Sequence, residues 1–151
     1  KLKAKGFTYL GAEDGIAMLH GDFAGYSDCQ IVALSMKETG KVNAVAVVFP
    51  TVEEWSSLER NYNRLKDMLT EKYGEPKYVI EEFQNNYVSD NSSKWHELSM
   101  DRCTWMSEFE VLNGTIELYI NKMDYGEAAV ILKYYDKANT DVVRASAMDD
   151  L

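Results

Sequence analysis

The residues from Thr51 to Gly74 constrain the fold most, because their secondary structure, both ends and the buried side can be predicted from the sequence. Large apolar residues recur there at spacings of three and four, which places them on one stripe of an α-helix: Trp55, Leu58, Tyr62, Leu65 and Leu69. The opposite stripe is polar and charged. This pattern predicts an amphipathic helix that lies on another layer of the protein and buries one side against it.

Both ends of this helix carry residues that favour helix termini. Thr51 followed three positions later by Glu54 is typical of a capping box, in which each side chain bonds a free amide of the first turn. The capping box predicts that the helix begins at Thr51. Gly74 favours a left-handed helix end and Pro76 cannot continue a helix, so Tyr73 is expected near the last helical residue.

Runs of β-branched and aromatic residues, bounded by Gly and polar residues, predict strands on both sides of the helix. Four strands are expected before it, over residues 7–10, 16–23, 29–36 and 42–49, with a hairpin turn at 38–41. Four more are expected after it: one over 77–83, two that form a hairpin from residue 103 onward, and the last over 129–135.

The polar segment between residues 84 and 101 interrupts the strands. Ser93 is placed to cap a short helix whose apolar side carries Trp95 and Leu98; the alternative is a long loop. A second short helix is expected at the end of the chain, capped by Thr140 and ending near Met148.

Asn113-Gly114 is the strongest short hairpin signal in the chain. A two-residue turn at these positions predicts that Val111 lies opposite Ile116 and that Phe109 lies opposite Leu118. The same register predicts two carboxylates opposite each other on the outer face, Glu110 and Glu117, which is mildly destabilising.

Taken in order, the expected elements are a helix end at residues 2–6, four strands, the long helix, four strands and a short helix. Residues 2–7 (LKAKGF) and 69–74 (LTEKYG) place Leu, Lys and Gly at a helix end before strands. This predicts a single α+β domain of two α-β4 repeat-like units, roughly 1–50 and 51–151, with one antiparallel sheet and helices on one face. The architecture resembles that of β-lactamase-inhibitor-like proteins, which are binding modules.

The charge of the chain argues against nucleic acid as a partner. Asp and Glu number 25 against 16 Lys and Arg, and the resulting net charge of −9 repels a phosphate backbone. No apolar run approaches the length of about 20 residues that spans a bilayer, and no signal-peptide pattern opens the sequence. The chain starts at Lys1 on what we interpret as the last turn of a helix, so we expect that an upstream segment has been removed.

Short motifs of turn and core residues occur along the whole chain: Lys5-Gly6-Phe7, residues 21–26 (GDFAGY) with Cys29, residues 69–76 (LTEKYGEP), residues 114–118 (GTIEL) and Asp149-Asp150-Leu151. Together they resemble a family of small uncharacterised proteins of Bacteroidetes that commonly carry a signal peptide. The resemblance implies an exported protein, periplasmic or extracellular. It carries over no catalytic residue.

Export would place the two cysteines in an oxidising compartment, where Cys29 and Cys103 have only each other as an intramolecular partner. Each begins a strand of its own repeat-like unit, so a disulfide would join the two halves. The alternative is that both are reduced and buried, because a free cysteine behaves as a small apolar residue.

The sequence offers little support for a catalytic, metal or cofactor site. The two histidines, His20 and His96, have no metal-ligand spacing, and no phosphate-binding loop or nucleophile elbow occurs. Cys29 with His20 is a conceivable thiol and base, although nothing in the sequence brings them together. The carboxylates Glu108, Glu110 and Glu117 can hold Ca²⁺ or act as an acid–base pair, but such residues more often solvate a sheet.

Aromatic residues outside the expected core are the better indication of function. Tyr26, Tyr87 and Trp95 occupy turns or the polar segment, and Tyr and Trp are enriched at interface hot spots. Trp95 can instead pin the polar segment to the body of the protein. We therefore expect an exported binding or interaction domain without catalytic activity and with no cofactor, whose partner is a protein or a small molecule. The alternative is a small hydrolase-like enzyme that uses the surface carboxylates or the Cys29 thiol.

Overall fold

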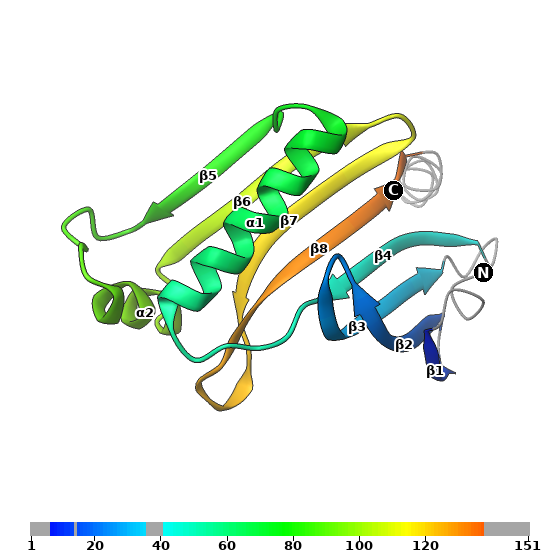
Figure 1. The fold of residues 1–151 in the computed structure, drawn as a ribbon, viewed down its shortest axis with the longest axis horizontal. Coiled ribbons are helices and arrows are strands. Elements are labelled where there is room, and N and C mark those ends of the chain that lie inside the picture. Colours follow the sequence, from blue (N-terminus) through cyan, green and yellow to red (C-terminus); the bar gives the residue numbers. More distant parts are fainter. Residues whose placement is uncertain (1–6, 14, 36–40, 138–151) are drawn as a thin grey trace, which may run out of the picture.

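The computed structural model describes residues 7–13, 15–35 and 41–137. Eight antiparallel strands form one sheet in the order β1-β2-β3-β4-β8-β7-β6-β5. Two helices accompany the sheet (Figure 1). The elements in chain order are β1 (Thr8–Glu13), β2 (Ile16–Phe23), β3 (Tyr26–Ser35), β4 (Val42–Val48), α1 (Trp55–Tyr73), β5 (Tyr78–Phe83), α2 (Asn91–Ser99), β6 (Cys103–Val111), β7 (Gly114–Lys122) and β8 (Ala128–Asp136).

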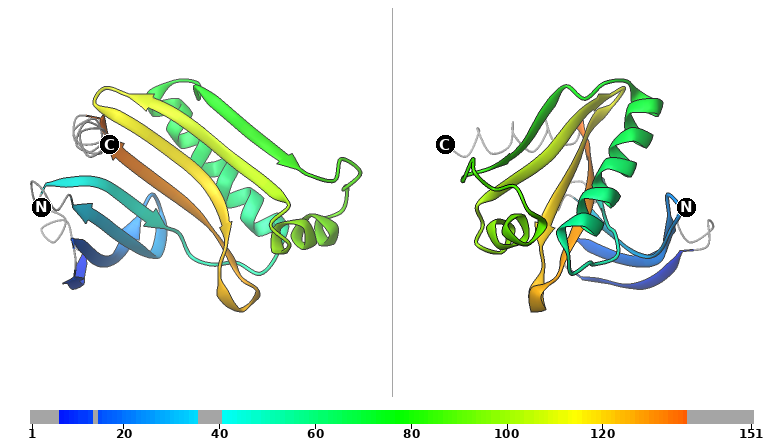
Figure 2. Two further views of the ribbon diagram at one scale, coloured as in Figure 1. Left: turned by 180° about the vertical axis from the view of Figure 1, so that it is seen from behind. Right: turned by 60° about the vertical axis from the view of Figure 1, so that its left-hand side comes forward.

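The long helix α1 lies across one face of strands β6, β7 and β8, and from behind these strands stand in front of it (Figures 1 and 2). All five residues of its predicted apolar stripe are buried, as the spacing requires. They pack on the inward side chains of the sheet, which include Val47, Phe109, Ile116, Leu118 and Val130. Burial of this stripe is the main apolar contact between the two layers.

The strand order divides into two four-stranded meanders that meet through their last strands, β4 and β8. An α+β fold with one antiparallel sheet is therefore confirmed. The equivalence of the two meanders as α-β4 units stays a prediction, since the helix expected before β1 and the helix expected from Thr140 lie outside the described residues.

The prediction that the long helix begins at Thr51 is wrong. Residue Val52 forms an isolated antiparallel bridge with Ala128, through backbone hydrogen bonds of 2.8 and 2.9 Å, and this holds the chain extended. The helix begins at Trp55, and the Glu54 carboxylate accepts from the Ser57 hydroxyl at 2.8 Å instead of capping a backbone amide.

The predicted end of α1 is confirmed. Tyr73 is its last residue, and the amide of Gly74 donates to the Thr70 carbonyl at 2.9 Å. Gly74 has φ +90°, a backbone conformation that residues with a Cβ rarely adopt.

Several strands begin or end at positions other than those predicted. The third strand begins at Tyr26 instead of Cys29, because Ala24 and Gly25 both have positive φ and close a two-residue turn that pairs Phe23 with Tyr26. The first strand extends to residue 13 instead of ending at residue 10. The turn predicted at 38–41 falls mostly outside the described residues.

The predicted register of the second hairpin is wrong by two residues. The turn consists of Leu112 and Asn113, so Val111 pairs with Gly114 and Phe109 with Ile116. Gly114 lies in the strand, paired with Val111 and Asp136, and only glycine fits there because a Cβ would collide with the backbone oxygen of Tyr135. A shift of two residues leaves each side chain on its predicted face, since side chains alternate with a period of two.

The polar segment contains a helix, as one of the two alternatives predicted, but Ser93 does not cap it. Asp90 is the N-cap, and its carboxylate accepts from the Ser93 amide at 2.8 Å and from the Ser93 hydroxyl at 2.9 Å. These bonds hold the pKa of Asp90 below its usual value. Neither helix of the described residues is long and apolar enough to cross a membrane.

Candidate functional site

Helix α2 is anchored to the body of the protein by a salt bridge at its buried side. Glu97 is buried, and both of its carboxylate oxygens accept from Arg102, at 2.9 and 3.1 Å. The neighbouring Leu98 is part of the core, and Trp95 packs against it. A bidentate pair of this kind fixes orientation as well as position, so α2 presents its outer residues from a defined place.

The end of α2 is tied to the end of β7. Asp101, which follows the helix, has φ +58°, a conformation that Asp tolerates better than most residues. Its carboxylate lies 2.9 Å from the ammonium of Lys122, which also donates to the Ser99 carbonyl at 3.3 Å. These contacts bring α2 beside the hairpin between β7 and β8.

This β7–β8 hairpin ends in an unusual turn. Tyr125 and Gly126 have φ values of +61° and +73°, and two successive positive values are typical of a type I′ turn. Such turns favour Asn-Gly, whereas a bulky side chain at positive φ is strained. The Tyr125 side chain is 99% exposed. Packing in the core therefore does not explain why a tyrosine occupies this position.

A hollow of about 350 Å³ lies between α2 and this hairpin. We call it the α2–hairpin hollow. Its walls combine aromatic and apolar side chains with carboxylates: Trp95, Leu98, Met123, Asp124, Tyr125 and Glu127. The surface is concave, partly apolar and built on anchored elements, which are the properties of a binding site.

Tyr87 lies on the other side of α2. It is 93% exposed and lines a second hollow, of about 320 Å³, together with Asn85, Val88, Ser92 and His96. The structure thus brings two of the three predicted interaction residues, Tyr87 and Trp95, to opposite flanks of one short helix. Exposed Tyr125 joins them at the same end of the sheet.

Tyr26, the third predicted interaction residue, lies elsewhere. Its hydroxyl donates to Asn61 at 3.3 Å, its ring centroid lies 5.3 Å from that of Phe49, and the guanidinium of Arg64 sits 5.2 Å from the ring centre. Tyr26 therefore joins the β2–β3 hairpin to the middle of α1 and lines neither hollow beside α2.

Of the two alternatives for Cys29 and Cys103, the structure has the free thiols and not the disulfide; Cys29 is buried and Cys103 half-buried. Cys29 is in β3 and Cys103 in β6, with β4, β8 and β7 between them. Four strand spacings of about 4.8 Å separate the two strands by roughly 19 Å, far beyond the limit of about 7 Å between bridged Cα atoms.

The Cys29 thiol is also poorly placed for nucleophilic chemistry. It is fully buried and donates to the Tyr26 carbonyl at 3.5 Å. Burial is the largest cause that raises its pKa, which disfavours the reactive thiolate. Cys29 pairs with Gly21 and His20 with Gln30, so the Cys29 and His20 side chains point to opposite faces of the sheet. His20 instead lies 3.5 Å from Asp28.

The candidate carboxylates lie on the sheet face away from α1, around a hollow of about 400 Å³. Glu117 is directly opposite Glu108 on one side and Lys133 on the other, so the like-charge pair involves Glu108 instead of the predicted Glu110. Burial, then Glu108, raises the pKa of Glu117, and Lys133 partly opposes this. Glu110 is exposed and paired with Lys77 at 3.5 Å.

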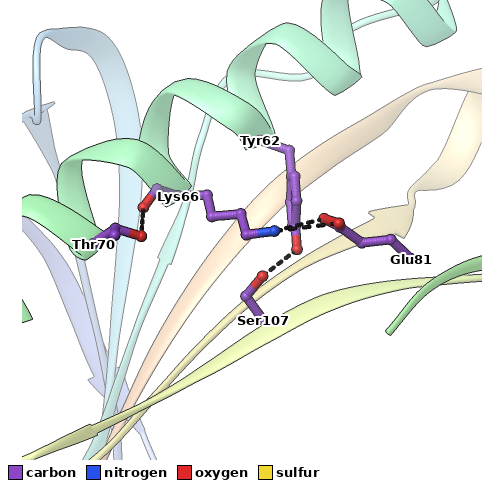
Figure 3. A network of polar contacts seen from close by, with 5 residues as sticks. All are labelled: Tyr62, Lys66, Thr70, Glu81 and Ser107. Atoms are coloured by element: carbon purple, nitrogen blue, oxygen red, sulfur yellow. Dashed lines mark hydrogen bonds and ion pairs between the residues drawn. The ribbon is translucent and has the colours of Figure 1, made fainter. Parts of the chain in front are cut away.

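A polar network under α1 also contains groups used in catalysis elsewhere, namely hydroxyls and a lysine (Figure 3). The Tyr62 and Ser107 hydroxyl oxygens are 2.5 Å apart, and the Lys66 ammonium nitrogen lies 3.1 Å from a carboxylate oxygen of Glu81. Tyr62 and Ser107 are completely buried. Because these two hydroxyls are closed off from solvent, we interpret the network as a structural link that joins α1 to β5 and β6.

Sequence reasoning missed Tyr125. The signal for it is the tripeptide Asp124-Tyr125-Gly126 between two predicted strands, because Gly is favoured at the second central position of a type I′ hairpin turn, in which both central residues have positive φ. Within the described part of the chain, no three His, Cys, Asp or Glu side chains gather closely enough to hold a metal ion.

The chain matches no known protein-family model, and neither a curated protein nor a solved structure is significantly similar to it. The arrangement of its residues therefore carries the functional argument.

Proposed function

We propose that this protein is a non-catalytic binding domain that recognises another protein through the end of the sheet formed by α2 and its two flanking loops. The observation that carries the proposal is the fully exposed Tyr125, held at positive φ beside the α2–hairpin hollow. Backbone strain of this kind is retained where the surrounding structure and a function require it.

The composition of this surface supports protein recognition. The side chains on or next to α2 include two exposed tyrosines, one tryptophan and two methionines: Tyr87, Tyr125, Trp95, Met100 and Met123. Aromatic residues and Met are enriched in protein interfaces, because they provide a large contact area at a low cost in conformational entropy. The salt bridges of Glu97 and Asp101 already hold α2 in place, which limits the ordering required on binding.

We also propose that the protein is exported and that its fold consists of two repeat-like units. We infer a periplasmic or extracellular location from the family resemblance. The meeting of two four-stranded meanders at β4 and β8 supports the idea of two repeat-like units in a β-lactamase-inhibitor-like arrangement. Fold analogy alone transfers no partner, so the partner must be found at the surface itself.

Site-specific photo-crosslinking tests the proposal. A benzophenone amino acid is placed at Tyr125 or at Tyr87 and illuminated in cells that natively make the protein. Leu112 provides the matched control, because it is 96% exposed but lies in the β6–β7 turn at the other end of the sheet. We expect one discrete adduct of the same partner from positions 125 and 87 and none from position 112.

Adducts from position 112 alone, or no adduct from any of the three positions, would contradict the assignment of this surface. Fractionation of the same cells checks the location, since a protein found only in the cytosolic fraction is not exported.

A further inference from the structure

We infer that the α2–hairpin hollow binds a cationic side chain, Lys or Arg, presented by the protein partner. The inference rests on the proposed function and specifies the chemistry of its site. It follows from the charge of the walls, from their aromatic side chains and from the choice of residue at position 125.

The charged groups of the hollow favour a cation. Asp124 and Glu127 line it, and the only cationic side chain in its walls, Lys122, already lies 2.9 Å from the carboxylate of Asp101. The walls therefore present two carboxylates in excess. The net charge of −9 adds to the attraction at longer range.

The aromatic side chains suit the same ligand. Trp95 and Tyr125 stand at the walls of the hollow, and a guanidinium or ammonium over such a ring gains a cation–π interaction that strengthens on desolvation. The alkyl stems of Arg and Lys pack on apolar surface while the charged end bonds carboxylates, and Leu98 and Met123 supply that surface. An anionic side chain would be repelled by the carboxylates of the lining, and a purely apolar side chain would leave them without a charged partner.

The residue at position 125 strengthens the argument. Asn is the favoured residue at this position of a type I′ turn that ends in Gly, and the Tyr125 ring contributes nothing to the core. A contact between the Tyr125 ring and a bound partner would explain why an aromatic residue occupies this position. Tyr125→Asn is therefore a useful variant, because it keeps the turn and removes only the ring.

Short peptides test the inference directly. Acetylated and amidated Gly-Gly-Arg-Gly-Gly is titrated into the isotope-labelled protein, and the amide resonance of Tyr125 and the indole resonance of Trp95 are followed by NMR. Citrulline replaces Arg in the control peptide, because it has nearly the same shape without the charge. We expect saturable shifts with Arg and binding at least about two- to fivefold weaker with citrulline, the range that one exposed cation–π contact provides.

Two double variants with the same change in net charge show whether the carboxylates of the hollow or the net charge of the whole protein attract the Arg peptide. Asp124→Asn with Glu127→Gln should weaken binding of the Arg peptide by at least about threefold, as expected for adjacent charges at a surface. Glu71→Gln with Glu75→Gln, at the far end of α1, should leave it unchanged. Tyr125→Asn should weaken binding of the Arg peptide by about two- to fivefold, while its melting temperature is equal to or higher than that of the parent protein.

Equal binding of the Arg and citrulline peptides would overturn the inference, as would equal weakening by both double variants. The two experiments can fail independently. A crosslinked partner at position 125 without any preference for the Arg peptide supports the interaction surface and rejects its cation specificity. Selective binding of the Arg peptide without any crosslinked protein supports the cation site and rejects the proposed protein-recognition function.

Discussion

The hydroxyl of Tyr62 in α1 and the hydroxyl of Ser107 in β6 lie 2.5 Å apart in the interior, where each is the other's hydrogen-bond partner. The two residues are separated by 45 positions in the chain. Burial, which is the largest cause, raises the pKa of Tyr62 well above its usual value, so its proton stays in place for this bond. The pair is a buried polar contact between the helix and the sheet and helps to fix their relative position.

Removing either partner should destabilise the fold, because the other hydroxyl loses this bond while it stays buried. We expect Tyr62→Phe and Ser107→Ala each to lower the free energy of unfolding by about 1–3 kcal/mol. The double variant should cost less than the two single losses together, by at least about 0.5 kcal/mol. Urea unfolding of the four proteins measures this, and strictly additive losses would argue against a direct bond.

The two sides of α1 should respond very differently to truncation. Leu65 is 2% exposed and Met68 is 42% exposed, although they lie less than one turn apart. Leu65→Ala should lower the free energy of unfolding by about 2–4 kcal/mol, whereas Met68→Ala should change it by less than about 0.5 kcal/mol. Similar losses in the two variants would mean that α1 does not bury the predicted stripe.

The pair of Glu108 and Glu117 should make stability depend on pH. Burial and Glu108 raise the pKa of Glu117, so the folded state binds this proton more tightly than the unfolded state does. The stabilising contribution is present below the usual carboxyl pKa and is lost as pH rises through the raised pKa. Glu108→Gln should therefore stabilise the protein at pH 7 by roughly 0.2–1 kcal/mol, and the gain should vanish near pH 3.

Glu110→Gln is the control for this experiment. Glu110 is exposed and faces Lys77, so its removal relieves no like-charge contact. An equal gain from both variants at pH 7 would indicate a general effect of net charge and not the Glu108–Glu117 pair.

The two cysteines should behave as protected thiols. Burial raises the pKa of Cys103 to about 12 and also raises that of Cys29, so native protein at pH 8 should react slowly with iodoacetamide. After unfolding without a reducing agent, intact mass should show two added alkyl groups. A mass without added groups would reveal a disulfide and contradict the separation of β3 and β6.

The sequence alone was sufficient for elements that depend on local patterns. The stripe from Trp55 to Leu69 and the helix end at Gly74 were predicted correctly, because spacing and backbone preference act within a few residues. The α+β class followed from the same patterns. Of the residues that line the proposed surface, the sequence pointed to Tyr87 and Trp95, since aromatic residues in a polar segment stand out without knowledge of the fold; Tyr87 is exposed, whereas Trp95 is half-buried and packs against the core.

Contacts between segments far apart in the sequence bear on where α1 begins and how β6 pairs with β7. The bridge from Val52 to Ala128 keeps the chain extended before α1, and Gly114 lies in β7 at a place beside Tyr135 where only glycine fits. Neither contact leaves a signal near the affected residues. A one-dimensional pattern shows which side chains share a face, but not which strand lies beside which.

The same reason explains why the sequence left two alternatives open for the cysteines and why it missed part of the proposed site. Strand order alone separates Cys29 from Cys103, and the pairing of β7 with β8 beside α2 alone places Tyr125 next to Trp95. Local preference determined which residues form helices and strands. Only the tertiary structure decided which of them meet, because the order of strands depends on long-range packing that no short stretch of sequence contains.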